Sequence, residues 1–254
     1  MIRVGRHQDS FQHSIDDWVS CAFRNGCQDF RTLVHSLPGV FPMDAIKSVF
    51  RLERRRVISR DLAQNVVETA KQGVFHVVRQ NGSYLPVPHP LDFDWRFDLQ
   101  AINYLSKICR ALSGFVVCLG TPSLFEHFRG SSNMRSIFID CNLAAIEHFG
   151  VSRFGDVVKC DCLRDPVPSV TNNLVVLDPP WYEQHTLSFL WVAAQMCNTN
   201  GKVLMSVPPL GTREDVASER IRLIDFARQL GLIVENIHEG VLPYETPHFE
   251  HNTL

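Results

Sequence analysis

The segment Leu177–Tyr182, with the sequence Leu-Asp-Pro-Pro-Trp-Tyr, combines residue types that can hold an amino group. It follows the apolar run Leu174–Val176, which we interpret as a buried strand. Because proline has a fixed φ and no N–H, we expect the backbone to leave the sheet here, with the carbonyls of Asp178 and Pro179 facing solvent or a pocket. Carboxylates and carbonyls accept hydrogen bonds from an amine, and an aromatic face can stack on its carrier. The candidate catalytic residues are therefore Asp178, Pro179, Pro180, Trp181 and Tyr182; the alternative is a Pro-Pro turn with surface aromatics.

The segments around this motif predict a parallel sheet. From residue 115 onward, short apolar runs alternate with helical patterns, which is typical of a doubly wound α/β sheet. In such a sheet, ligands bind beyond the carboxyl ends of the strands, where the strand order reverses. We expect strands at 115–119, 136–140, 157–161, 174–178, 202–207 and 233–237, and helices at 124–128, 143–149, 186–197 and 215–230.

Polar residues end the strands that precede the motif. The first strand runs into Gly120, where the backbone can approach a ligand closely, and Ser123 can cap the next helix. Asp140 stands twenty positions after Gly120, a spacing that suits a carboxylate holding both hydroxyls of a ribose. Asp161 could accept a hydrogen bond from an adenine amino group, although Asp is also common in ordinary strand-end turns. The cofactor-binding candidates are Gly120, Thr121, Ser123, Asp140, Asp161 and Cys162.

This order of segments resembles that of the class I S-adenosylmethionine-dependent amino-methyltransferases over roughly residues 90–240. The loop Gly120–Ser123 and the Asp-Pro-Pro-Trp-Tyr motif look like the N6-adenine-methyltransferase-like branch, which includes protein-lysine methyltransferases. The resemblance implies a Rossmann-like sheet, S-adenosylmethionine as cofactor, and an amino nitrogen as methyl acceptor. It would place Gly120, Thr121 and Ser123 against the methionine part, Asp140 on the ribose, Asp161 on the adenine and Asp178–Tyr182 on the target nitrogen.

Two departures and two rival functions stay open. The sequence ends at Leu254, so we expect the last strand of this class to be missing or very short, and there is no obvious insert for target recognition. Branched-chain polyamine synthases also carry an Asp-Pro-Pro segment and transfer aminopropyl from decarboxylated S-adenosylmethionine. Their first loop is acidic, whereas Thr121-Pro122-Ser123 has no acid, which favours a methyl sulfonium. The other rival is an inactive Rossmann-type nucleotide-binding or scaffold protein.

Other residues near the predicted site have less defined roles. Trp95, Arg96 and Phe97 either close over the pocket or belong to a linker packed on the sheet. His185 could accept a proton, but an ordinary surface histidine is the simpler interpretation. The acceptor itself, in a nucleic acid or a protein, is undecided at this stage.

Residues 1–85 predict a separate, mainly helical domain, possibly a winged helix. Helical patterns at 16–23, 30–37, 42–56 and 60–71 precede a strand at 73–78 and a turn at 81–82, and Ser59 can cap the fourth helix. A basic stripe on the third helix comprises Lys47, Arg51, Arg54, Arg55 and Arg56; it would either face phosphates or be a solvated surface. Three prolines within 86–90 mark the boundary with the Rossmann-like domain, 86–254.

Bulk properties suggest an ordinary globular protein. The net charge is +4 for residues 1–85 and −6 for residues 86–254, so the two parts differ in their expected partners. The eight cysteines show no metal-binding C-x-x-C spacing, and four lie inside apolar runs. With neither a membrane-length apolar run nor a signal segment, we expect a cytoplasmic protein that binds no metal and no membrane. The sequence does not indicate an oligomeric state.

Overall fold

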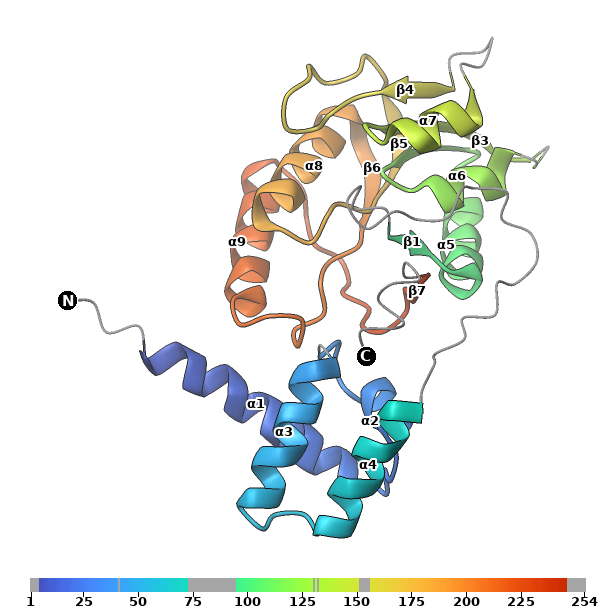
Figure 1. The fold of residues 1–254 in the computed structure, drawn as a ribbon. Coiled ribbons are helices and arrows are strands. Elements are labelled where there is room, and N and C mark those ends of the chain that lie inside the picture. The colour runs from blue at the N-terminus through green and yellow to red at the C-terminus, as the bar shows by residue number, and fades with distance from the viewer. Residues whose placement is uncertain are drawn as a thin grey trace. The chain divides into compact units, whose positions relative to one another are not determined.

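The computed structural model describes residues 5–40, 42–72, 95–129, 131, 133–150 and 156–245 (Figure 1). The chain divides into two compact units. One comprises Met1–His76, Pro208–Glu219 and Phe249–Leu254, and the other comprises Val77–Val207 and Arg220–His248. The proline-rich boundary expected at 86–90 lies outside the described residues.

Within residues 5–40 and 42–72 of the first unit, four helices pack around one apolar core. Two of the helices begin at side-chain caps. Asp29 accepts a 2.9 Å hydrogen bond from the backbone N–H of Thr32, and the Ser59 hydroxyl accepts one of 3.2 Å from Leu62, as predicted for Ser59. The strand and turn expected at 73–82 lie outside the described residues, so the winged-helix prediction is untested. The helices are α1 (Gly5–Arg24), α2 (Phe30–Ser36), α3 (Pro42–Arg54) and α4 (Arg60–Gln72).

The second unit contains the predicted parallel sheet. Its strand order is β4-β3-β2-β5-β6, and all neighbouring pairs are parallel. The doubly wound α/β prediction is therefore confirmed. Strand order reverses between β2 and β5, which makes their carboxyl ends the expected ligand position. The strands are β2 (Phe115–Leu119), β3 (Arg135–Asp140), β4 (Val157–Lys159), β5 (Asn172–Leu177) and β6 (Cys197–Met205).

Helices cover both faces of this sheet, so its central strands are apolar on both sides. In β2, Val116 and Cys118 pack into the cluster that includes α5, α6 and α7, whereas Val117 and Leu119 pack with α8. This alternation follows from the two-residue period of a strand. The helices are α5 (Leu99–Leu112), α6 (Pro122–Arg129), α7 (Leu143–Phe149), α8 (Glu183–Met196) and α9 (Val216–Gln229).

Two sequence predictions about elements were wrong. Residues 233–237 form no strand, and Ile233 is 87% exposed. The segment has an apolar pattern, but no described strand pairs with its backbone. Ser123 does not cap α6, because the helix already begins at Pro122. The role of the basic stripe was left open by the sequence, and the structure shows that two of its members, Arg51 and Arg55, form ion pairs with Asp16.

A two-stranded antiparallel sheet was not foreseen. It pairs β1 (Arg96–Phe97) with β7 (Tyr244–Glu245), and Phe97 lies opposite Tyr244. Along the sequence, β1 precedes the strands of the parallel sheet and β7 follows them, so the pairing joins two distant chain segments. It thereby brings Tyr244 close to the motif at the end of β5, as described below.

Candidate functional site

The loops after β2 and β5 lie together at the point where strand order reverses. The backbone N–H of Asp178 donates a 3.1 Å hydrogen bond to the carbonyl of Leu119, and that of Gly120 donates one of 2.9 Å to Ile139. Gly120 has a φ of 67°, and a Cβ there would lie 2.9 Å from the carbonyl oxygen of Asp178. Only glycine fits this position without strain. The structure thus brings the predicted cofactor loop and the predicted acceptor motif into direct contact.

The carboxyl group of Asp178 is held by two hydroxyl groups. Ser206, which follows β6, donates a short hydrogen bond to Oδ1, and Tyr244 of β7 donates one of 2.6 Å to the same oxygen. Among the described residues, no hydrogen bond reaches the second oxygen, Oδ2. One oxygen therefore fixes the carboxyl group, and the other remains available as an acceptor.

Burial changes the acidity of this pair. It raises the pKa of Asp178 from its ordinary 3.8 to about 7, a shift that the bonds from Ser206 and Tyr244 oppose and the charge of Asp140 increases. Burial and the charge of Asp178 raise the pKa of Tyr244 well above its usual range. Tyr244 therefore keeps its proton and acts as the donor, while Asp178 titrates near neutral pH.

Aromatic rings surround the motif. Trp181 packs edge-to-face against Trp95, with ring centroids 5.6 Å apart, and against Tyr244, at 5.3 Å. Tyr244 also contacts Phe97, at 5.2 Å. Trp95 therefore packs against the motif itself, and Trp181 lies inside a small aromatic cluster. Tyr182, by contrast, is 55% exposed.

The prolines give the motif its turn. Pro179 is buried, and the carbonyl of Pro180 accepts a 2.7 Å hydrogen bond from the N–H of Tyr182. The carbonyl of Tyr182 then accepts from His185 and Thr186, which starts α8. The sequence predicted that the Asp178 carbonyl faces solvent or a pocket, whereas in the structure it faces the Gly120 loop.

The Gly120 loop contains an unusual buried hydroxyl. Thr121 is 1% exposed, and its Oγ1 forms no hydrogen bond of acceptable geometry with any described residue, although the Cys118 thiol lies nearby. Such a group costs about 1–3 kcal/mol unless it is satisfied. Thr121 directly precedes α6, and Ser123 lies in the first turn, where free backbone N–H groups attract negative charge. This is a position at which a ligand carboxylate would be stabilised.

The acids at the ends of β3 and β4 make local turns. Asp140 Oδ1 accepts a 2.9 Å hydrogen bond from Asn142, and Asp161 Oδ1 accepts one of 2.9 Å from Leu163. The other oxygen of Asp161 lies 3.6 Å from Arg164, whose side chain is 83% exposed. These bonds are typical of strand-end turns, and they also fix the orientation of both carboxylates.

The thiols of the cysteines beside these acids have raised pKa values. Burial raises the pKa of the Cys162 thiol, and neighbouring Cys160 and Asp140 raise it further. Burial likewise raises the pKa of Cys141 to about 11. All eight cysteines are free, and no three metal-ligating side chains gather among the residues that the structure describes. Cys162 is therefore a buried, apolar side chain, and little of its thiol is ionised at neutral pH.

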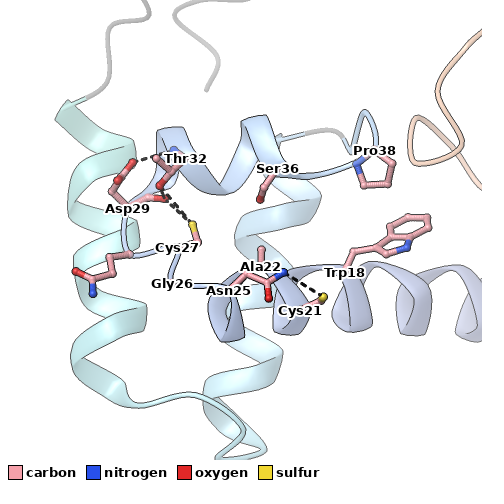
Figure 2. Close-up of a pocket in the computed structure, with 11 residues that line it drawn as sticks. Trp18, Cys21, Ala22, Asn25, Gly26, Cys27, Asp29, Thr32, Ser36 and Pro38 are labelled. Atoms are coloured by element: carbon pink, nitrogen blue, oxygen red, sulfur yellow. Dashed lines mark hydrogen bonds between the residues drawn. The ribbon is translucent and has the colours of Figure 1, made fainter. Parts of the chain in front are cut away.

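A hollow of about 600 Å³ lies in the helical unit and contains none of the predicted site residues (Figure 2). The end of α1, the turn that follows it and α2 line the hollow, with Trp18, Cys21, Cys27, Asp29 and Thr32 among its residues. The polar groups of Cys27 and Asp29 are already engaged with Thr32. The hollow therefore offers little unsatisfied chemistry.

Ser206 and Tyr244 are the site residues that sequence reasoning missed. Ser206 had a usable signal, since it is a polar residue at the end of a predicted strand, like Asp140 and Asp178. Tyr244 had none, because its position depends on the pairing of β1 with β7. Among the helices that the structure describes, none has the length and apolar character needed to cross a membrane.

Comparison with known proteins adds little to this geometry. No family model and no curated protein matches the sequence. Solved structures do match, among them an O-methyltransferase, NcsB1 from neocarzinostatin biosynthesis, crystallised with S-adenosyl-L-homocysteine and 1,4-dihydroxy-2-naphthoic acid. The identity is 13% and the TM-score 0.41, over 96% of this chain and 98% of that one. A likeness at this level carries no argument about the reaction.

Proposed function

We propose that this protein transfers a methyl group from S-adenosylmethionine to an amino nitrogen. The observation that carries the proposal is the carboxyl group of Asp178 at the strand reversal point. Ser206 and Tyr244 fix one of its oxygens, the other is available, and Trp181 lies close by. This arrangement provides an acceptor for an N–H group and an aromatic surface for its carrier.

The residues of the Gly120 loop fit such a cofactor. The left-handed backbone of Gly120 leaves no side chain beside Asp178, and the buried hydroxyl of Thr121 lacks a partner. The hydroxyl without a partner is explained if the amino-acid part of a cofactor lies here, with its carboxylate at the start of α6. In this proposal, Ser123 lies in the same first turn and contributes a further polar group.

The acids on the neighbouring strands would bind the nucleoside part. We assign Asp140 to the ribose hydroxyls, and Asn142 holds its carboxylate in place. We assign Asp161 to the adenine amino group, with the apolar Cys162 beside the ring. The exposed ion pair between Asp161 and Arg164 contributes little stability in water, so a ligand can replace Arg164 as the partner of Asp161.

S-adenosylmethionine, when bound, supplies an electrophilic methyl carbon whose bond to sulfur breaks with the electron pair left on sulfur, while a carbon–nitrogen bond forms. The chain's own contribution is to hold the acceptor. Asp178, as a carboxylate, accepts an N–H bond and orients the nitrogen lone pair. The nitrogen becomes positive as it gains a fourth bond, and the same carboxylate stabilises this charge and can take the proton released. The pKa of about 7 lets Asp178 do both near neutral pH.

The acceptor class is the finer part of the proposal. An exocyclic amine of a nucleobase would stack on the Trp181 cluster, and a base in a duplex would first have to flip out. A protein lysine would instead bind to the same rings as an alkylammonium, and it would have to lose a proton before its nitrogen could attack. Both are compatible with the carboxylate and the aromatic cluster.

The test is a methylation assay by mass spectrometry on nucleic acid, protein and polyamine pools, with two variants that separate the two subsites. Asp178→Ala should abolish transfer and leave S-adenosylmethionine affinity within a few-fold. Asp140→Ala should weaken cofactor binding at least about tenfold, because it removes charge-assisted hydrogen bonds to a ribose. Normal cofactor binding by Asp140→Ala, or transfer of aminopropyl from decarboxylated S-adenosylmethionine, would contradict the proposal.

A further inference from the structure

The corner between α3 and α4 is the most basic part of the helical unit. Residues Lys47–Arg60 include six basic side chains and one acidic side chain, Glu53. Such a concentration of charge is either neutralised within the fold or left to attract an anionic partner. The structure shows which of the six has which fate.

Two of these arginines serve the fold. The carboxylate of Asp16 in α1 is buried and accepts hydrogen bonds from Ser48, Arg51 and Arg55, at 2.6, 2.8 and 3.1 Å. This cluster ties α3 to α1. Arg51 and Arg55 are therefore poor candidates for binding a partner.

The remaining arginines face outward. Arg54, Arg56 and Arg60 are exposed and form no ion pair with any described residue, whereas Lys47 already contacts Asp44 at 2.8 Å. Phe50 is 45% exposed and lies between Lys47 and Arg54 on one face of α3, given the helical spacing of three and four residues. An exposed aromatic ring is thus flanked by cations on successive turns.

Arg56 occupies a position at which glycine is usual. Its φ is 59°, its N–H donates to Glu53 at 2.8 Å, and the N–H of Val57 donates to Leu52 at 2.9 Å. These two bonds form the Schellman end of α3, whose left-handed residue is most often glycine and sometimes asparagine. Among the described residues, Asn200, with a φ of 65°, is the other non-glycine residue with a left-handed backbone. An arginine there is conformationally unfavourable, which points to a use for its guanidinium.

We propose that the α3–α4 corner, comprising Phe50, Arg54, Arg56 and Arg60, binds single-stranded nucleic acid. Arginines without partners neutralise phosphates, and an exposed ring flanked by cations stacks with an unpaired base. A duplex offers its phosphates but hides its base faces, so the exposed ring favours a single strand. This inference goes beyond the proposed function and does not depend on S-adenosylmethionine.

The test is fluorescence anisotropy of the full chain with a labelled oligodeoxythymidine, titrated at several salt concentrations. The affinity should fall with salt, and Arg54→Gln/Arg56→Gln/Arg60→Gln should reduce the slope of log affinity against log salt by about 2, at about 0.7 per phosphate on a single strand. Phe50→Ala should lower affinity at least about fivefold, and Phe50→Tyr should keep it. These side chains have no described polar partner, so circular dichroism should show an unchanged fold.

Two controls make the result specific. Arg24→Gln/Arg31→Gln changes two exposed arginines of the same unit and should leave the slope nearly unchanged. Arg56→Gly should raise the unfolding temperature, because it relieves the left-handed backbone, and yet weaken binding. The proposal is overturned if the native chain does not bind the oligonucleotide at about 50 mM salt, if the control pair loses as much slope as the triple variant, or if a duplex binds equally and Phe50→Ala has no effect.

Discussion

Tyr244 donates a 2.6 Å hydrogen bond to Asp178 although 66 positions separate the two residues in the sequence. The bond exists because β7, which contains Tyr244, pairs with β1, which directly follows Trp95. Both segments then pack on Trp181, next to the carboxylate. In the proposed reaction, Tyr244 is therefore a positioning residue, which would act on the acceptor through Asp178 rather than by touching it.

Tyr244→Phe should shift the pH profile of the reaction. The Tyr244 hydroxyl stabilises the carboxylate form, so its loss raises the pKa of Asp178 above its value of about 7. Since the carboxylate is the form that accepts an N–H group, the rise in kcat with pH should move to higher pH. The measurement is kcat at saturating substrates between about pH 5.5 and 9, a range that brackets the pKa of Asp178.

Tyr104→Phe is the matched control, because it removes a tyrosine hydroxyl from α5, outside the motif. Its profile should follow that of the native protein. If Tyr244→Phe lowers kcat equally at every pH, then the bond does not tune Asp178, and the role of Tyr244 is structural.

Asp178→Asn should change how stability depends on pH. A carboxyl group whose pKa is higher in the folded state contributes stability that is present below about pH 4 and is lost as pH rises through about 7. Asparagine does not titrate, and its amide oxygen can still accept from Ser206 and Tyr244. The unfolding temperature of the variant, relative to the native protein, should therefore increase between pH 5 and 8. A constant difference across this range would show that Asp178 is not strained by burial, and Asp225→Asn, on an exposed side chain, serves as the control.

Gly120→Ala should damage the site more than a comparable change elsewhere. The new Cβ would lie 2.9 Å from the Asp178 carbonyl oxygen and 3.0 Å from the Phe189 ring, at a φ of 67°. Gly240 has the same φ with open space around it, so Gly240→Ala isolates the backbone cost of about 1–2 kcal/mol. Chemical denaturation should show a loss for Gly120→Ala larger by about 1–3 kcal/mol. Equal losses would mean that the two loops do not press on each other.

Thr121→Val should have opposite effects on the free and the ligand-bound protein. The variant replaces a buried hydroxyl that lacks a partner with a methyl group of similar size, so the free chain should gain about 1–3 kcal/mol. If Thr121 contacts the cofactor, the stabilisation produced by added S-adenosylmethionine should shrink. Thermal unfolding with and without the cofactor measures both. A free chain no more stable than the native one would show that the hydroxyl is satisfied in solution.

Local signals in the sequence were enough for the parallel sheet and for the residues at the carboxyl ends of its strands. Alternating apolar runs and helical patterns predict β2, β3 and β5 within a few residues, because strand and helix periods are properties of neighbouring residues. The carboxyl ends of parallel strands share one edge, so Gly120, Asp140 and Asp178 could be assigned to that edge without coordinates. The chemistry that we propose for them follows from their residue types.

Local sequence patterns give wrong predictions where the outcome depends on contacts with a distant segment of the chain. The apolar pattern at 233–237 predicted a strand, but no strand among the described residues pairs with this segment. The basic stripe showed no internal partner in the sequence, whereas Asp16 of α1 forms ion pairs with two of its arginines. Backbone pairing and ion pairing both depend on which distant segment of the chain packs against a helix or strand. The residues within that helix or strand do not determine which segment it is.

The tertiary structure alone decided the chemistry of Asp178. The sequence identified this carboxyl group and predicted that it holds an amine. It could not show that Ser206 and Tyr244 bind one oxygen, nor that burial brings the pKa to about 7. Acidity inside a protein is set by desolvation and by the groups that surround the carboxyl, and these come together only when β1, β5, β6 and β7 meet.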